Sequence, residues 1–151
     1  MSISVESLAD RERIKAVIYT YCQGVDRCQW DKVRDCFTDS AHHDHGTFAG
    51  DNDAFITFAA EVLEQMDSTL HHIGNILIDL DGESATSEAS FVAYHKMRKG
   101  ADGPLGLIEA DTDWIVAGRY CDRWQKTGED WHIVERRAVH DWTRTEPSTD
   151  G

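Results

Sequence analysis

The spacing of hydrophobic residues divides the chain into a helical first part and a second part made of strands. Apolar side chains recur at helical intervals in three segments. They predict a helix from near Leu8 to Gly24, a short helix over residues 30–37, and a third helix that Asp51 caps and that ends near Met66. Between the last two helices, the pattern indicates a short strand that runs into a turn.

After Ser68 the hydrophobic period shortens to two, as in strands that bury one face. Strands are predicted at about 69–80, 84–98, 107–126 and 130–143. Asp81-Gly82 is a strong hairpin signal, and a second turn is predicted just before residue 130. Helices followed by long antiparallel strands indicate a single α+β domain, with a core over residues 8–144 and a flexible tail from residue 145. A strongly bent sheet can curl around the helices and leave a cavity.

The composition of the chain argues against nucleic acid and membranes as partners. The 151 residues fit one domain, and the formal net charge of −13 argues against nucleic acid, because phosphate binding needs clustered Lys and Arg. No run of about 18 apolar residues is present, so no membrane span is expected. The first residues lack the basic and apolar regions of a signal peptide, so a cytoplasmic location is expected. The four cysteines form no C-x-x-C pair, which favours reduced, structural thiols.

Five of the eight histidines lie in two short segments, AHHDHG and LHHIGN. Alternate side chains of a strand share a face, so from residue 70 to residue 80 His72 belongs to an almost wholly apolar face and His71 to the other. We therefore predict that His72 is buried and that His71 is largely exposed. A buried imidazole needs a hydrogen-bond partner and is suited to proton transfer near neutral pH, although many buried histidines serve only in packing.

The AHHDHG segment separates into two pairs, because neighbouring residues of a strand point to opposite faces. His42 goes with Asp44, and His43 goes with His45. The segment therefore cannot supply four convergent metal ligands. A set made of His42, Asp44 and His72 remains an alternative metal site, although helical zinc spacings such as H-E-x-x-H are absent.

Three other positions carry candidate chemistry. Asp26 follows the first helix, where the negative end of the helix dipole does not favour a carboxylate, so it is an unusual structural choice. Tyr21 lies five residues earlier on the apolar stripe. His140 lies in the last strand, where neither face is clearly apolar. The pattern leaves open which face lines a cavity, and a solvated face with cross-strand charge pairs also fits.

In this order, the segments resemble the SnoaL-like branch of the nuclear transport factor 2-like superfamily. The resemblance rests on Y-x-x-x-x-D ending at Asp26 with Trp30 after it, on D-H-G-x-F-x-G, on H-I-G-N from His72, and on the late motifs G-R-Y-x-D-R-W and W-H-I-V-E-R-R. It covers residues 8–144 and is more specific for the fold than for a reaction.

The resemblance implies a cone-shaped α+β barrel, in which a strongly bent antiparallel sheet wraps three helices around a deep pocket. The family includes dehydratases and a dehydrochlorinase that use a His–Asp pair without a metal or organic cofactor, so no cofactor is expected. By position this pair is His72 and Asp26. The residues expected to assist them or to contact the substrate are Tyr21, His140, His42, Asp44, Trp30 and Phe55. A homodimer or higher homo-oligomer is expected, since the outer face of such sheets often pairs.

We therefore predict a cofactor-independent lyase, such as a dehydratase, that acts on a small apolar substrate of aromatic or polycyclic type. In this hypothesis Asp26 orients His72, which removes a proton from a carbon next to an activating group. A leaving group then departs from the neighbouring carbon. The same pocket would also suit an isomerase or cyclase, a non-catalytic binding protein, or the small subunit of an oxygenase.

Overall fold

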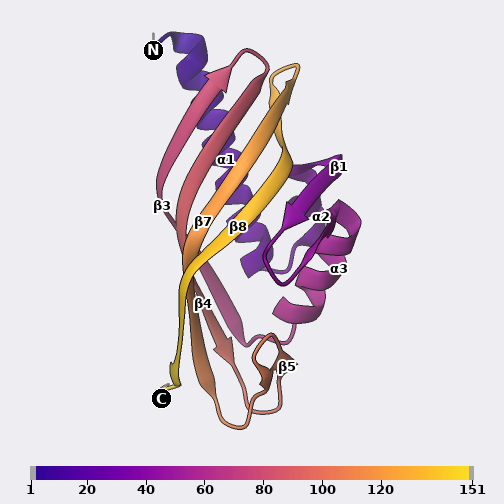
Figure 1. Cartoon of the computed structure of the whole chain (residues 1–151), viewed down its shortest axis with the longest axis vertical. Helices are drawn as coiled ribbons and strands as arrows, with labels where there is room; N and C mark the ends of the chain where they lie inside the picture. Colours follow the sequence, from indigo (N-terminus) through magenta and orange to yellow (C-terminus); the bar gives the residue numbers. More distant parts are fainter. Residues whose placement is uncertain (1–2, 150–151) are drawn as a thin grey trace.

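A bent sheet of six strands with three helices on its concave side makes up the computed structural model, which describes residues 3–149 (Figure 1). The elements in chain order are α1 (Val5–Asp26), α2 (Trp30–Asp35), β1 (Phe37–Asp44), β2 (Ala49–Asp51), α3 (Asn52–Leu63), β3 (Ser68–Asp81), β4 (Ser84–Met97), β5 (Asp102–Gly103), β6 (Gly106–Leu107), β7 (Thr112–Thr127) and β8 (Asp130–Pro147). Within residues 3–149, no helix has the length and apolar character needed to cross a membrane. All four cysteines are free thiols, as predicted.

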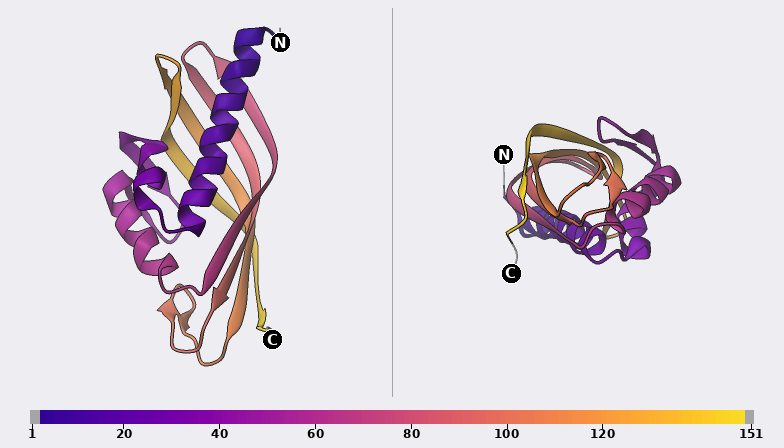
Figure 2. Two further views of the ribbon diagram at one scale, coloured as in Figure 1. Left: turned by 180° about the vertical axis from the view of Figure 1, so that it is seen from behind. Right: turned by 90° about the horizontal axis from the view of Figure 1, so that it is seen from below.

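The strands of the large sheet lie in the order β2-β1-β8-β7-β4-β3. Neighbouring strands are antiparallel, apart from the parallel pair of β1 and β8. Seen from below, the sheet is strongly curled, with the helices along its open side (Figure 2). The predicted α+β cone, with a strongly bent sheet around helices, is therefore confirmed.

The boundaries differ from the predicted ones at both ends of the chain. The first helix begins earlier than predicted, because Ser4 rather than Ser7 is its N-cap and the two serines form a reciprocal capping box. Strand β7 starts at Thr112, later than predicted, because Leu107 pairs in the small β5–β6 hairpin and residues 108–111 form a loop. Strand β8 runs to Pro147, past the start of the predicted tail, and residues 150 and 151 lie outside the described part of the chain.

Helix α1 lies along the free edge of β3, which ends the strand order of the sheet. The Arg11 guanidinium donates a hydrogen bond of 2.6 Å to the backbone carbonyl of Ile78. At the other end of the helix, its last residue, Asp26, accepts the backbone N–H of His71. Side chains of the helix therefore satisfy edge groups that have no neighbouring strand.

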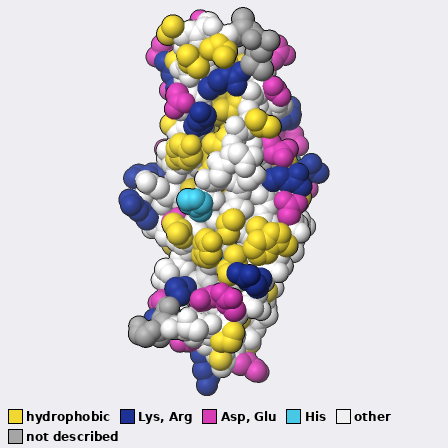
Figure 3. Space-filling model, turned by 90° about the vertical axis from the view of Figure 1, so that its left-hand side faces the viewer, with side chains coloured by type: hydrophobic (Ala, Val, Ile, Leu, Met, Phe, Trp, Pro, Cys, Tyr) yellow, Lys and Arg dark blue, Asp and Glu magenta, His cyan; other side chains and the backbone are white. Residues whose placement is uncertain are grey.

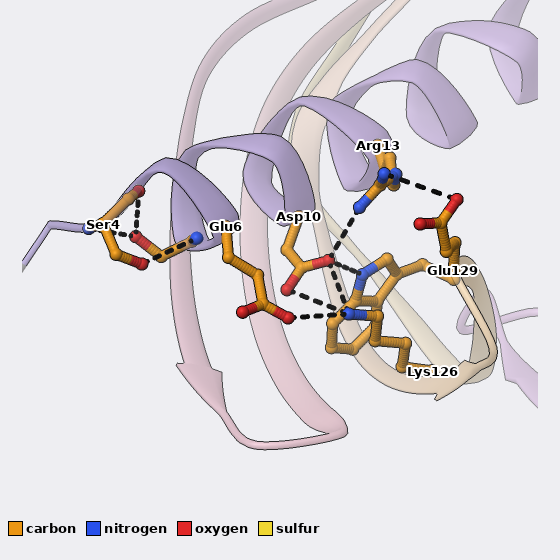
Figure 4. Close-up of polar contacts among 8 residues, drawn as sticks. Ser4, Glu6, Asp10, Arg13, Lys126 and Glu129 are labelled. Atoms are coloured by element: carbon orange, nitrogen blue, oxygen red, sulfur yellow. Dashed lines mark hydrogen bonds and ion pairs between the residues drawn. The ribbon is translucent and has the colours of Figure 1, made fainter.

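The first half of α1 is fixed to the turn between β7 and β8 by the buried carboxylate of Asp10 (Figure 4). It accepts a hydrogen bond of 3.0 Å from the Trp131 indole, and Lys126 Nζ lies 3.0 Å from the same oxygen. Burial works to raise the pKa of Asp10, but these donors outweigh it and hold the pKa below the ordinary value. The ionised carboxylate thus joins the helix to the hairpin.

Bulges break the alternation of the long strands and bend them. On β3, Ile73 and Ile76 pair with positions only two residues apart on β4. Strand β8 has two similar breaks opposite β7. At one of them, a Cβ on Gly118 would lie 1.9 Å from the backbone oxygen of Val139, so only glycine allows the strands to approach this closely.

The core contains a charged pair that is fully removed from solvent. Arg136 donates two hydrogen bonds of 2.8 Å to the carboxylate of Asp122, and neither side chain is exposed. The guanidinium carbon lies 4.2 Å from the ring centre of Tyr21 and 4.1 Å from that of Tyr120. Burial opposes the charge on Arg136, but Asp122 raises the pKa above its ordinary value, so the pair stays ionised.

Replacing Asp122 with asparagine should destabilise the fold by about 3–5 kcal/mol, because it leaves the buried cation without its counter-charge. The matched control is Glu135→Gln, which breaks the exposed pair with Arg123 and should cost less than about 1 kcal/mol. Urea unfolding followed by circular dichroism measures both changes. Equal losses for the two variants would contradict this view of the core.

Candidate functional site

A cavity of about 250 Å³ lies between the concave face of the sheet and helices α1 and α3. Its apolar wall includes Val25, Phe55, Phe58, Phe91, Trp114 and Val116. Its polar groups belong to His45, His71, His95, His140, Tyr21, Tyr120, Thr47 and Thr143. Among the described residues that line it, none is Asp, Glu, Lys or Arg. The cavity therefore presents imidazoles and hydroxyls within an apolar, uncharged surface.

Asp26 and His71 form a hydrogen-bonded pair at the edge of this cavity. Nδ1 of His71 lies 2.7 Å from a carboxylate oxygen of Asp26 and must carry the hydrogen, because an ionised carboxylate only accepts. The carboxylate also accepts the His71 backbone N–H and the hydroxyl of Thr69. These donors offset the unfavourable position of Asp26 at the end of a helix. Nε2 of His71 is left as the basic nitrogen.

The prediction that His72 is the buried histidine was wrong. His72 is exposed on the outer face of β3, and His71 is the partner of Asp26. The bulge between Ile73 and Ile76 shifts the side-chain alternation by one residue. The apolar residues after the bulge therefore lie on the same face as His71. Regular alternation without a bulge would place them on the face of His72.

A second imidazole lies next to His71. The ring of His95 on β4 is 5.7 Å from the ring of His71 and almost perpendicular to it. Nδ1 of His95 lies 3.1 Å from the backbone oxygen of Trp114, so Nδ1 carries the hydrogen and Nε2 can accept one. Burial, with a smaller contribution from the charge of His71, lowers the pKa of His95 to about 4. His95 is thus a neutral acceptor at physiological pH.

The predicted inward pair of the AHHDHG segment was also wrong. His42 is exposed, and Asp44 accepts the backbone N–H of Gly46 in a turn. His43 and His45 point inward, on the same face as the buried Ala41. The division into two pairs was correct, and the apolar character of Ala41 was the available signal for which pair faces the core.

His43 packs beneath the cavity and is not part of its wall. Its Nε2 lies 3.0 Å from the side-chain oxygen of Asn52, and its ring stacks on Phe55 at 4.3 Å. Burial lowers the pKa of His43 to about 4. The structure thus assigns His43 a packing role.

The other predicted residues divide between the cavity and the surface. Tyr21, Phe55 and His140 line the cavity. Trp30 does not line it, and its indole donates a hydrogen bond to Glu64 on the exposed side of the helices. Burial raises the pKa of Tyr21 to about 12 and lowers that of His140, so both are uncharged near neutral pH.

The alternative metal set is not brought together by the fold. His42 and Asp44 belong to β1, and His72 lies on the outer face of β3, with three strands between them in the sheet. Among residues 3–149, no three His, Cys, Asp or Glu side chains are grouped closely enough to hold a metal ion.

Comparisons with other proteins agree on the architecture. A family model described as a SnoaL-like domain matches residues 6–137. A protein of Novosphingobium aromaticivorans, provisionally assigned as a scytalone dehydratase, has 18% identity and a TM-score of 0.80, with 99% of each chain covered. Hexachlorocyclohexane dehydrochlorinase LinA-type3 of Novosphingobium barchaimii has 13% identity and a TM-score of 0.79, with 94% of this chain and 93% of that chain covered.

A third similar structure is the Kfla4162 protein of Kribbella flavida, with 20% identity and a TM-score of 0.76. The match covers 89% of this chain and 93% of that chain. At these identities the structures show a shared fold. A comparison with curated protein sequences gives no match.

The buried histidines predict a loss of stability in mild acid. His43 and His95 have a pKa of about 4 in the fold and an ordinary value of 6.5, so the unfolded chain binds more protons between these values. The free energy of unfolding should therefore fall as the pH decreases from about 6.5 to about 4, by roughly 1.4 kcal/mol per unit of pKa difference for each histidine.

Urea unfolding at a series of pH values measures this slope. His95→Gln should reduce the slope, because glutamine does not titrate in this range. Asp10 does not account for the change, since its pKa lies below 3.8 and its effect begins at more acid pH. A free energy of unfolding that stays constant between pH 7 and pH 5 would contradict the prediction.

Proposed function

Because the chain belongs to the SnoaL-like domain family, we propose that it is a cofactor-independent lyase that removes water or a similar leaving group from a small uncharged substrate. One observation carries the proposal. It is the hydrogen bond of 2.7 Å between His71 and Asp26 at the wall of an apolar cavity. Similarity to structures named as a dehydratase and a dehydrochlorinase supports the same class of reaction.

His71 is the proposed base. Asp26 holds Nδ1 of the ring as the donor, so that Nε2 has the lone pair that accepts a proton. The carboxylate also stabilises the imidazolium that forms when Nε2 is protonated. Asp26 is itself held by the Thr69 hydroxyl and the His71 backbone N–H, so its orientation is fixed before a substrate arrives.

In the proposed reaction, Nε2 of His71 takes a proton from a carbon next to a carbonyl group. The electron pair of the broken C–H bond forms a carbon–carbon double bond, and the C–O bond at the next carbon breaks. The departing hydroxide takes a proton from the imidazolium and leaves as water, so His71 returns to its neutral form. His95 and His140 lie on the same wall and are the proposed hydrogen-bond partners of the substrate oxygens.

The lining of the cavity supports an uncharged substrate. With no Asp, Glu, Lys or Arg among the described lining residues, a charged group would enter without a partner, which is costly in an apolar site. The volume of about 250 Å³ lies below the roughly 300–1,000 Å³ of sites for drug-sized ligands. We therefore propose a compact aromatic or alicyclic substrate of one or two rings.

Replacing His71 with glutamine should reduce turnover at least about 100-fold, because the reaction loses its proton acceptor. The assay is a panel of hydroxylated aromatic ketones, with the loss of water followed by mass spectrometry, which separates a lyase from an isomerase. Asp26→Asn should also lower turnover, since the orienting charge is lost. The matched control is His72→Gln, which changes the adjacent exposed ring and should keep the wild-type rate. Similar rates for the His71 and His72 variants would refute the mechanism.

We further propose that the chain forms a homodimer through the outer face of the sheet. On this face, two neighbouring rows of side chains run across β3, β4, β7 and β8, with one residue from each strand in each row. The first row consists of Leu70, Tyr94, Ile115 and Arg144. The second row consists of His72, Val92, Ala117 and Trp142. We call these eight residues the outer patch. Leu70, Tyr94 and Trp142 are each about half exposed, and hydrophobic side chains gather on this side of the molecule (Figure 3).

Charge supports a second copy as the occupant of the outer patch. Each chain has a net charge of −13, so two copies repel one another over most of their surfaces. The outer patch contains no Asp or Glu, and carboxylates at its borders are paired, as Asp113 is with Lys96 and Asp141 with Arg119. The patch is therefore a surface on which two such chains can meet with little repulsion.

Trp142→Glu should convert the dimer into a monomer, because it brings two uncompensated carboxylates into the contact. Sedimentation equilibrium in about 0.15 M salt measures the mass, since this salt limits the repulsion between distant charges. Leu77→Glu is the control, because Leu77 is an exposed leucine of β3 outside the outer patch. A monomeric wild type, or a Trp142→Glu variant that remains dimeric, would contradict the proposal.

A further inference from the structure

The ring of His45 is held at the cavity wall by packing and by its backbone. It lies between β1 and β2, and its plane stacks on Phe55 with the ring centres 4.7 Å apart. The His45 N–H donates to the backbone oxygen of Phe48 at 2.8 Å, and its carbonyl accepts from Thr47. The ring therefore has a fixed position before any ligand binds.

No described residue makes a hydrogen bond to either ring nitrogen of His45, and Nε2 is buried. Of the other inward histidines, His43, His71 and His95 each have a protein partner, and His140, which has none among the described residues, is the most exposed of the set. Other buried polar atoms without a partner, such as Nη1 of Arg136, belong to residues that do not line the cavity. A buried polar atom normally has a partner, and the position of His45 in the cavity wall leaves its Nε2 available to a molecule that enters the cavity.

His45 and His71 reach the cavity from opposite ends of the strand order. His45 follows β1, which is second from one edge of the sheet, and His71 is on β3 at the other edge. The curl of the sheet brings both to the same cavity (Figure 2). A substrate between them would have its reacting carbon at His71 and its far end at His45.

We propose that His45 anchors the substrate through a hydrogen bond to an uncharged oxygen, either hydroxyl or carbonyl, at the end remote from the reacting carbon. The assignment of the reacting end rests on the proposed function, while the anchoring role of His45 does not. It predicts a substrate with oxygen at both ends of a compact ring system.

The electrostatic surroundings of His45 favour an uncharged oxygen over a carboxylate. Burial, together with the nearby cation of Arg136, lowers the pKa of His45 well below its ordinary value. The ring is therefore neutral, and it can accept a hydrogen bond from a hydroxyl or donate one to a carbonyl.

The test compares 2-naphthol with naphthalene, which has the same ring system but lacks the hydroxyl. Dissociation constants come from NMR titrations of the full-length protein, without any measurement of turnover. Wild type should bind 2-naphthol at least about fivefold more tightly than naphthalene, as expected when a buried polar atom gains its partner. The 15N shift of the His45 ring should respond to 2-naphthol only.

His45→Phe retains the stacking on Phe55 and removes both ring nitrogens. It should bind the two probes almost equally, with unchanged affinity for naphthalene. His45→Gln restores a hydrogen-bonding group and should recover part of the preference for 2-naphthol over naphthalene. The matched control is His42→Phe, an exposed neighbour on the opposite face, which should keep the wild-type ratio.

His71→Gln separates this inference from the proposed function. It should keep the preference for 2-naphthol, so a failure to find lyase activity leaves the anchoring role standing. The proposal is overturned if wild type binds neither probe or binds both equally, or if the preference survives in His45→Phe or disappears in His71→Gln. If His45→Phe does not fold, the proposal is tested by the 15N shift of the His45 ring in wild type, and a shift that does not respond to 2-naphthol overturns it.

Discussion

The buried guanidinium of Arg136 is the constraint on which the arrangement of the molecule depends. A cation removed from solvent must keep its carboxylate, so Asp122 fixes β7 against β8 in one register. The rings of Tyr21 and Tyr120 enclose the charge and place α1 against the same point of the sheet. The tyrosines separate this charge from the cavity, and the cation also helps to keep His43 and His45 neutral. The buried charge of Arg136 in the core thus helps to keep the cavity wall uncharged.

The bulges of the sheet decide which side chains reach that cavity. One extra residue on β3 places His71 rather than His72 beside Asp26, and a break on β8 puts Arg136 and His140 on the inner face. The bend that closes the cone and the choice of histidine thus have a common origin. A change in this bulge would alter both the shape of the cavity and the residue that lies in it.

The elements could be predicted from the sequence more fully than the site. Hydrophobic spacing and the Asp51 cap located α2, α3 and most of each long strand, because period and capping are local properties. Asp26 could be selected because a carboxylate after an apolar helical stripe is unusual, and Tyr21 because it lies on that stripe and matches a position of the family that the chain resembles. The choice between His71 and His72 could not be made, because the position of a bulge depends on pairing with β4. His95 could have been found, since it follows Ala89, Phe91 and Ala93 at alternate positions of β4.

Asp26 also has a consequence for the solubility of the protein. Strand β3 pairs with another strand on one side only. On its free side, Asp26 accepts the backbone N–H of His71, which could otherwise pair with a strand of another molecule. The carboxylate that holds the imidazole of His71 thus also protects the edge of β3 from pairing with a strand of another molecule. Loss of this carboxylate would therefore expose the edge of β3 to a strand of another molecule, as well as remove the hydrogen-bond partner of His71.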